Sequence, residues 1–165
     1  MKEIPLTQGK FALVDDDDYE YLSQWKWCYD NGYAKRGQWN PVTKKIIQIF
    51  MHRVIMNAKK GEAVDHANHN TLNNKKYNLR ICTYAQNMYN SKSNKNSSSK
   101  YKGVSWNKRC KKWQVYIIYE GKRINLGYYK DEEEAARVYD KAAIELFREF
   151  ALPNFPRRVA RRRLA

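Results

Sequence analysis

The sequence has few cysteines and no long hydrophobic run. Its three cysteines, Cys28, Cys82 and Cys110, lie far apart and form no C-x-x-C motif, which argues against a disulfide framework and a structural zinc site. No apolar stretch approaches the ~20 residues that span a bilayer, mean hydropathy is −0.90, and the N-terminus lacks a basic-then-apolar signal pattern. We therefore expect a soluble protein of the cytoplasm.

Acidic residues are also scarce. The chain has 17 Asp and Glu against 32 Lys and Arg, which gives a net charge of +15. Such a balance favours a polyanionic partner, and nucleic acid is a better candidate than a membrane surface because no membrane segment is present. The 13 Tyr, five Trp and five Phe supply rings that either build cores or lie against sugars and bases.

A polar stretch divides the chain. Residues 91–100, SKSNKNSSSK, contain no apolar side chain and are predicted to be a linker that buries nothing. Residues 1–90 carry 13 basic and 9 acidic side chains, whereas residues 91–165 carry 19 and 8, so the second half is the stronger electrostatic anchor. We predict domains at 1–90 and 101–156, followed by a basic tail at 157–165.

The first domain starts with FALVDDDDYEYLSQWKW, which predicts a short strand, an acidic turn and a brief helix. Carboxylates in the first turn suit the positive end of the helix dipole. The run Asp15 to Asp18 is therefore interpreted as a solvated helix start and not as a cation site, which needs side chains that converge.

The most informative segment contains an Asp-His pair. GEAVDH predicts a short strand whose last two residues, Asp65 and His66, point to opposite sides, so one can hold a metal while the other faces a water. A polar loop follows over 68–77, and Leu79 to Cys82 predicts a second strand. Thr83 and Gln86 then fit a helix-capping box that starts a helix at Tyr84.

Two strands followed by a helix can place two strand ends and the helix around one cation. Asp65 and Asn87 would be its oxygen ligands, and oxygen ligands suit a hard divalent ion such as Mg²⁺, with Mn²⁺ as an alternative. Asn90 lies almost one turn beyond Asn87 and is the alternative helix ligand.

The segment resembles the HNH endonuclease family in its intron-homing phage type, through D-H, an Asn-rich loop, N-L-R and a later helix Asn, over about residues 50–90. The resemblance implies a ββα-metal (HNH, His-Me finger) module, with His66 as general base, Asp65 and Asn87 as metal ligands and Asn78 as the residue that braces the loop. The family's final His is Asn here, which favours a single hard cation over zinc. An isolated Asp-His pair is usually structural, but the combination is specific.

Three neighbouring residues have less defined roles. His52 lies in an apolar, helix-like run and is expected to pack or to lie near a phosphate. Arg53 and Arg80 are predicted phosphate contacts without sequence specificity.

The second half predicts an α+β domain. YKGVSW, KKWQVYIIYEG and KRINLGYY have strand character and are separated by turns, which indicates an antiparallel three-stranded meander. DEEEAARVYDKAAIELF predicts a helix with acids at its start and apolar residues at helical spacing. We expect this helix to cover the apolar face of the sheet.

The opposite face of that sheet is the predicted DNA-binding surface, because a sheet of this width fits the major groove. Its members are polar, basic or aromatic residues on the strands and their rim: Lys102, Ser105, Trp106, Lys108, Arg109, Tyr116, Ile118, Arg123 and Asn125. The alternative, a basic face that is merely solvated, is less favoured because this half carries a net charge of +11 together with interleaved rings.

This half resembles the plant ethylene-response-factor (Apetala-type) DNA-binding domain over residues 99–156, through YKGV, W-x-V-x-I, GKRINLG, EEAARVYDKAAI and NFP. The resemblance implies that the exposed strand residues contact DNA. Family arginines are replaced at Ser105, Ile118 and Asn125, so the recognised DNA sequence does not transfer from the plant proteins.

Together these patterns predict a site-specific, metal-dependent endonuclease of double-stranded DNA, acting as a monomer with no protein partner in a bacterial or phage-infected cell. The second half would supply target recognition. One alternative is a DNA-binding regulator with an inactive nuclease module, although an intact Asp-His-Asn set argues against decay. Another is an RNA-binding protein, which leaves that set unexplained.

Overall fold

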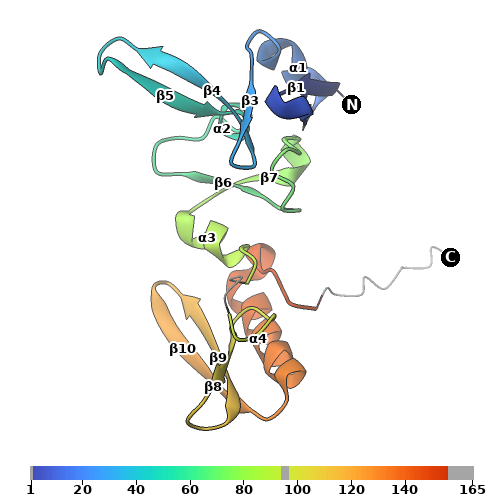
Figure 1. Cartoon of the computed structure of the whole chain (residues 1–165), viewed down its shortest axis with the longest axis vertical. Helices are drawn as coiled ribbons and strands as arrows, with labels where there is room; N and C mark the ends of the chain where they lie inside the picture. Colours follow the sequence, from blue (N-terminus) through green and yellow to red (C-terminus); the bar gives the residue numbers. More distant parts are fainter. Residues whose placement is uncertain (1, 94–96, 156–165) are drawn as a thin grey trace, which may run out of the picture. The chain divides into compact units, whose positions relative to one another are not determined.

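The computed structural model describes residues 2–93 and 97–155. The chain forms two compact units, Met1–Asn87 and Met88–Ala165, and the division falls inside helix α3, Tyr84–Tyr89 (Figure 1). Among the described residues, no helix is long and apolar enough to cross a membrane. The predicted basic tail lies outside the described residues.

Unit 1 begins with a small antiparallel pair of strands. β1 (Lys2–Pro5) and β2 (Phe11–Val14) are joined through the short 3-10 turn η1 (Thr7–Gly9). Helix α1 (Asp16–Leu22) follows with three Asp residues in its first turn. The predicted strand, acidic turn and helix are confirmed.

The next three strands form an antiparallel sheet that was not predicted. β3 (Cys28–Asp30), β4 (Tyr33–Asn40) and β5 (Lys45–Phe50) are arranged in the order β3-β4-β5. β5 leads directly into the short helix α2 (Met51–Ile55).

The predicted pair of strands around the Asp-His motif is present as an antiparallel hairpin. β6 (Ala63–His66) pairs with β7 (Leu79–Cys82), and the connecting loop ends in a 3-10 turn, η2 (Lys76–Asn78). Helix α3 follows. Its predicted capping box is confirmed, because the Thr83 amide donates to Gln86 Oε1 at 2.9 Å and the Gln86 amide donates to Thr83 Oγ1 at 3.2 Å.

The core of unit 1 lies between the β1–β2 pair, α1 and the root of the β3-β4-β5 sheet. Its buried members are apolar residues from all of these elements: Ile4, Leu6, Ala12, Val14, Leu22, Trp27, Ala34 and Met51. The Trp27 indole N–H donates to the Leu22 carbonyl at 2.8 Å, which satisfies the one polar atom of that buried ring.

Unit 2 contains the predicted three-stranded meander. β8 (Val104–Asn107), β9 (Lys112–Tyr119) and β10 (Lys122–Tyr129) are ordered β10-β9-β8 and all pairs are antiparallel. Helix α4 (Glu132–Phe147) follows and continues into the 3-10 turn η3 (Arg148–Phe150). The Glu134 amide donates to the N-cap Asp131 at 2.7 Å, which fixes the start of α4.

The core of unit 2 joins one face of this sheet to α4, and Figure 1 shows the helix running beside the strands. The shared cluster is apolar apart from one phenol: Val104, Val115, Ile117, Ala135, Ala136, Tyr139, Ala143 and Phe147. Gly103 has φ +76°, and a Cβ there would lie 2.0 Å from the Tyr139 ring. Only glycine fits this position.

The predicted linker is partly built into unit 2. Ser99 is buried, and its hydroxyl donates to Glu132 Oε1 at 2.6 Å. The Trp106 amide donates to Ser98 Oγ at 2.8 Å. The expectation that this stretch buries nothing is therefore wrong at Ser99, because a hydrogen-bonded hydroxyl is cheap to bury.

Candidate active site and nucleic-acid surface

The Asp-His pair ends strand β6 inside unit 1. Asp65 is 4% exposed and His66 is 5% exposed. Arg80 lies opposite Asp65 on β7, and its Nε donates to Asp65 Oδ2 at 3.1 Å, with a further ion pair through Nη2. A buried carboxylate needs such a partner, because an isolated charge pays a large desolvation cost.

The imidazole of His66 is held by a residue that the sequence did not single out. His66 Nε2 and Asn74 Oδ1 lie 3.3 Å apart, and Asn74 is fully buried. Burial lowers the pKa of His66, and the bond to Asn74 and the charge of Asp65 partly oppose that shift. His66 is therefore neutral at pH 7, as a proton acceptor must be.

A second histidine lies against the first. His52 on α2 is 7% exposed, and its ring centroid is 5.1 Å from that of His66. Tyr33 and Phe50 pack on His52, each at 5.5 Å. Its Nδ1 is buried and has no hydrogen-bond partner among the described residues. Burial, with the neighbouring His66 and Arg53, lowers the pKa of His52 to about 3, so this imidazole is uncharged.

Asn78 organises the loop between the two strands. It is buried, its Oδ1 accepts from the Asn68 amide at 3.0 Å, and its Nδ2 donates to the Asn73 carbonyl at 2.7 Å. These contacts are of the kind expected for a loop brace. The Asn-rich composition of the loop was the available signal for Asn74, since buried loop backbone needs short amide side chains as partners.

The two helix residues predicted as alternative metal ligands differ in their burial. Asn87 is exposed on α3, whereas Asn90 is buried. Within the described residues, no hydrogen bond joins the Asn87 side chain to Asp65 or His66, so its predicted role rests on the motif and not on a contact.

Three predicted DNA contacts have internal partners instead. Arg53 donates to the carbonyls of Glu62 at 2.6 Å and Lys59 at 2.9 Å, and Arg80 pairs with Asp65. Lys102 Nζ donates to the carbonyls of Tyr89 at 2.6 Å and Ser91 at 2.7 Å, and burial lowers its pKa to about 8. Carbonyls and a carboxylate therefore engage these three cations inside the protein, and their predicted contacts with DNA stay predictions.

The remaining predicted contacts lie on the face of the β8-β9-β10 sheet that points away from α4 or on its rim. Ser105 and Tyr116 are half-buried, and the exposed ones are Trp106, Lys108, Arg109, Ile118, Arg123 and Asn125. The Arg123 guanidinium lies 3.8 Å from the centre of the Tyr116 ring. This stacking holds the guanidinium against the ring, and its in-plane N–H donors can still form hydrogen bonds elsewhere.

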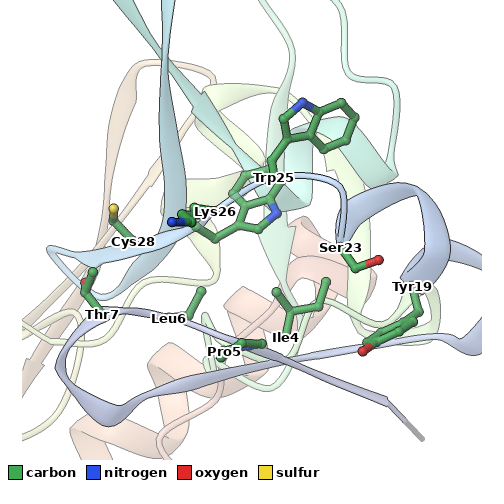
Figure 2. Close-up of a pocket in the computed structure, with 10 residues that line it drawn as sticks. Ile4, Pro5, Leu6, Thr7, Tyr19, Ser23, Trp25, Lys26 and Cys28 are labelled. Carbon is green, nitrogen blue, oxygen red and sulfur yellow. The ribbon is translucent and has the colours of Figure 1, made fainter.

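A pocket in unit 1 lies apart from these residues (Figure 2). Its volume is about 550 Å³, and its wall is formed by Ile4, Pro5, Leu6, Thr7, Tyr19, Ser23, Trp25, Lys26, Trp27 and Cys28. The wall contains no imidazole or carboxylate, and none of the predicted site residues. We assign it no part in the chemistry.

The two residues predicted as metal ligands are of a type that suits a hard cation. Asp65 and Asn87 offer oxygen donors, and Mg²⁺ in proteins is commonly bound by one or two carboxylates, with water and phosphate oxygens as its other ligands. No group of three or more His, Cys, Asp or Glu that could hold a metal occurs in the part of the chain that the structure describes.

Comparison with known proteins identifies the two halves of the chain. Residues 50–89 match the HNH endonuclease family and residues 99–149 match the AP2 domain. An uncharacterized HNH endonuclease of Acanthamoeba polyphaga mimivirus is 34% identical over 154 residues, which cover 89% of this chain and 76% of the relative. The chain therefore belongs to the HNH endonuclease family, and it is a DNA endonuclease with an AP2-like DNA-binding domain.

Other relatives match in part. Protein 3.8 of Escherichia phage T7 is 35% identical over 92 residues, covering 56% of this chain and 75% of that protein. An ethylene-responsive transcription factor-like protein of Arabidopsis thaliana is 52% identical over 44 residues, covering 27% of this chain and 18% of that protein. No solved structure matches the chain.

Proposed function

We propose that this protein is a site-specific, divalent-metal-dependent endonuclease of double-stranded DNA, in which unit 1 hydrolyses the phosphodiester and unit 2 recognises the target. The observation that carries the proposal is a neutral, buried His66, held through Asn74, next to the Asp65 carboxylate on a β6–β7 hairpin that leads into α3. We interpret hairpin and helix as a ββα-metal module of the His-Me finger type.

His66 is the general base in this proposal. The tautomer with the proton on Nε2 donates to Asn74 Oδ1, and Nδ1 is then the basic nitrogen. A water adds to phosphorus while His66 takes its proton, the bond from phosphorus to the 3′ oxygen breaks, and the leaving oxygen takes up a proton from solvent. General base catalysis of this kind contributes about 10² to 10⁴ in rate.

Asp65 and Asn87 are the proposed protein ligands of the metal, with Mg²⁺ favoured and Mn²⁺ as the alternative. When bound, a divalent ion would stabilise negative charge on the phosphate and on the leaving oxygen. The ion pair with Arg80 fixes the orientation of the Asp65 carboxylate. Asn78 acts indirectly, because it fixes the loop that carries Asn74.

Target recognition is assigned to the outer face of the β8-β9-β10 sheet, with Arg123, Asn125 and the rim cations Lys108 and Arg109 as leading contacts. Tethering this surface to unit 1 raises the local concentration of the catalytic site at a bound target. We propose that one chain acts alone. The virus and phage relatives support action inside an infected cell.

The test compares the wild type with His66→Ala and a matched control, His69→Asn, on supercoiled plasmid with Mg²⁺. We expect His66→Ala to lose cleavage by at least about 10² while its DNA affinity stays unchanged. His69→Asn should cut normally, because Asn tolerates the positive φ of that position. Equal product from His66→Ala and the wild type would remove His66 from the mechanism.

A further inference from the structure

Charge in unit 1 is separated along the chain. Residues 1–30 carry three basic and seven acidic side chains, whereas residues 31–61 carry seven basic and no acidic ones. The β4–β5 hairpin lies in the second segment. The positive charge of unit 1 is therefore concentrated on the hairpin and on the residues just after it.

The hairpin extends away from the rest of unit 1 (Figure 1), and its outer part is exposed. Trp39 is 60% exposed, Val42 is 89% exposed and Ile46 is 65% exposed. Trp39 and Ile46 face each other across the two strands, and Ile46 lies over Gly37, where a Cβ would be 2.9 Å from it. Trp39, Val42 and Ile46 form an exposed apolar patch, which we call the hairpin tip.

The turn at the tip is ordered and basic. Asn40 Oδ1 accepts from the amides of Val42 at 2.9 Å and Thr43 at 3.1 Å, which closes an Asx-type turn. Lys44 and Lys45 follow it and are exposed. This hydrogen-bonded turn thus presents two cations beside an apolar patch. Because β5 is an edge strand, an exposed apolar patch there is an aggregation hazard, and its presence suggests a binding role.

The root of the hairpin lies at the catalytic histidine. Tyr33, the first residue of β4, has its ring 6.1 Å from the His66 ring, and Phe50, the last residue of β5, has its ring 5.5 Å from that of His52. An eight-residue strand spans roughly 26 Å, which is about the length of seven or eight base pairs. A duplex with a phosphate at His66 therefore has the hairpin within reach.

We propose that the β4–β5 hairpin is a second DNA-binding element, which follows a groove of the duplex away from the cut site. Lys44 and Lys45 contact phosphates, and Trp39 and Ile46 press against sugars and base edges of the minor groove, where proteins insert apolar wedges. The inference rests on the proposed function, because it assumes that DNA binds at His66. The mixture of cations and apolar surface favours DNA over a protein partner.

The first experiment measures binding without cleavage, in the full-length His66→Ala background. Affinity for a 40-base-pair random-sequence duplex is measured by fluorescence anisotropy over a range of salt concentrations. We expect the double variant Lys44→Gln/Lys45→Gln to bind about tenfold more weakly at 0.1 M salt and to lower the slope of log affinity against log salt by about 1 to 2. Lys44→Arg/Lys45→Arg should retain the wild-type values.

The matched control is Lys10→Gln/Lys26→Gln, which removes the same charge from exposed positions in the acidic segment of unit 1. If both double variants weaken binding equally, the effect comes from the net positive charge of the whole protein, and the proposed contact is wrong. If neither does, the hairpin does not bind DNA.

The second experiment tests the tip with Trp39→Ala, using Phe11→Ala as a control because Phe11 is also exposed on a strand of unit 1. Permanganate reactivity of thymines reports unstacked bases. Trp39 lies six residues along β4 from Tyr33, which is roughly 20 Å or about six base pairs of duplex. We therefore expect reactive thymines about six base pairs from the cut site with the parent protein and with Phe11→Ala, and loss of this reactivity with Trp39→Ala. Unchanged thymine reactivity with Trp39→Ala would show that Trp39 does not insert between bases. The proposal would also be wrong if the parent protein sediments as a dimer and Trp39→Ala as a monomer, since the hairpin tip would then be a contact between two proteins.

These outcomes are separate from failure of the proposed function. If the wild type does not cut DNA with Mg²⁺ yet the hairpin variants lose affinity, the nuclease mechanism fails and the hairpin stands. If the wild type cuts DNA, and the hairpin variants have the same affinity and the same thymine reactivity as their parent, the nuclease mechanism stands and the hairpin proposal fails.

Discussion

The two units bury different kinds of side chain. The buried polar residues described in unit 1 include the proposed catalytic histidine and its neighbours: His52, Asp65, His66, Asn73, Asn74 and Asn78. Those of unit 2 are fewer: Asn90, Ser99 and Asp140. The Asp140 carboxylate accepts from the amides of Asn154 at 2.7 Å and Phe155 at 2.9 Å, so it fastens the chain after α4. Unit 1 therefore buries more polar groups, among them those proposed for the chemistry, whereas unit 2 has an apolar core and its proposed DNA contacts lie on the surface.

The largest effect is expected from Gly103→Ala, which attacks the apolar core of unit 2. A Cβ would collide with the Tyr139 ring at 2.0 Å, in a backbone with φ +76°. We expect unit 2 to lose about 4 kcal/mol of unfolding free energy, measured by hydrogen exchange on peptides from each unit. Gly121→Ala is the control, since it has φ +75° but open space around its Cβ, and should cost only about 1 kcal/mol. Equal losses in the two variants would mean that backbone strain, and not the collision with the Tyr139 ring, causes the loss of unfolding free energy.

Next in size is Asn78→Ala, which attacks the polar core of unit 1. It leaves the Asn68 amide and the Asn73 carbonyl without their side-chain partner, and two such buried groups cost about 3 kcal/mol. Exchange should rise in peptides of the 66–78 loop, with cleavage reduced in parallel. Asn78→Asp keeps the acceptor and should lose less. Full activity of Asn78→Ala would show that the loop does not depend on this brace.

A pH titration separates the units, because all three histidines are in unit 1. The pKa of His52 is about 3 in the folded protein and about 6.5 when unfolded, so the unfolded state binds the extra proton between these values. Unit 1 is therefore stabilised above pH 6.5 and loses stability as the pH falls, by about 2 kcal/mol at pH 5. His52→Gln should show a smaller loss over this window, measured by urea unfolding at each pH. An identical pH dependence in that variant would contradict the burial of a neutral His52.

The smallest effect is expected at the surface of unit 2. Arg123→Ala should leave stability unchanged and weaken binding to a cognate duplex by about 1 to 2 kcal/mol if the guanidinium contacts a base edge. The control is Arg137→Ala, because Arg137 lies on α4. Competition with unrelated duplexes decides the type of contact, since a uniform loss over all sequences would make Arg123 a phosphate contact.

Much of the fold was predictable where local patterns are strong. Alternation placed Val115 and Ile117 in the core of unit 2, and the Thr83 and Gln86 pair marked the start of α3. The β3-β4-β5 sheet was not foreseen, because β4 and β5 have no clean alternation of buried and exposed residues: most of the hairpin is exposed on both faces. Apolar and polar residues alternate along a strand only where one of its faces packs on a core, and most of this hairpin does not.

The sequence by itself determined the Asp65-His66 motif, the loop of asparagines and the excess of positive charge, since these depend on residue type and spacing alone. The tertiary structure decided which groups meet. It brought His52 and Asn74 to His66 from different parts of the chain, and it gave Arg53, Arg80 and Lys102 partners inside the protein. Lys and Arg side chains are long enough to turn toward a carbonyl or outward to a phosphate, so charge counting cannot distinguish a surface contact from a buried hydrogen bond.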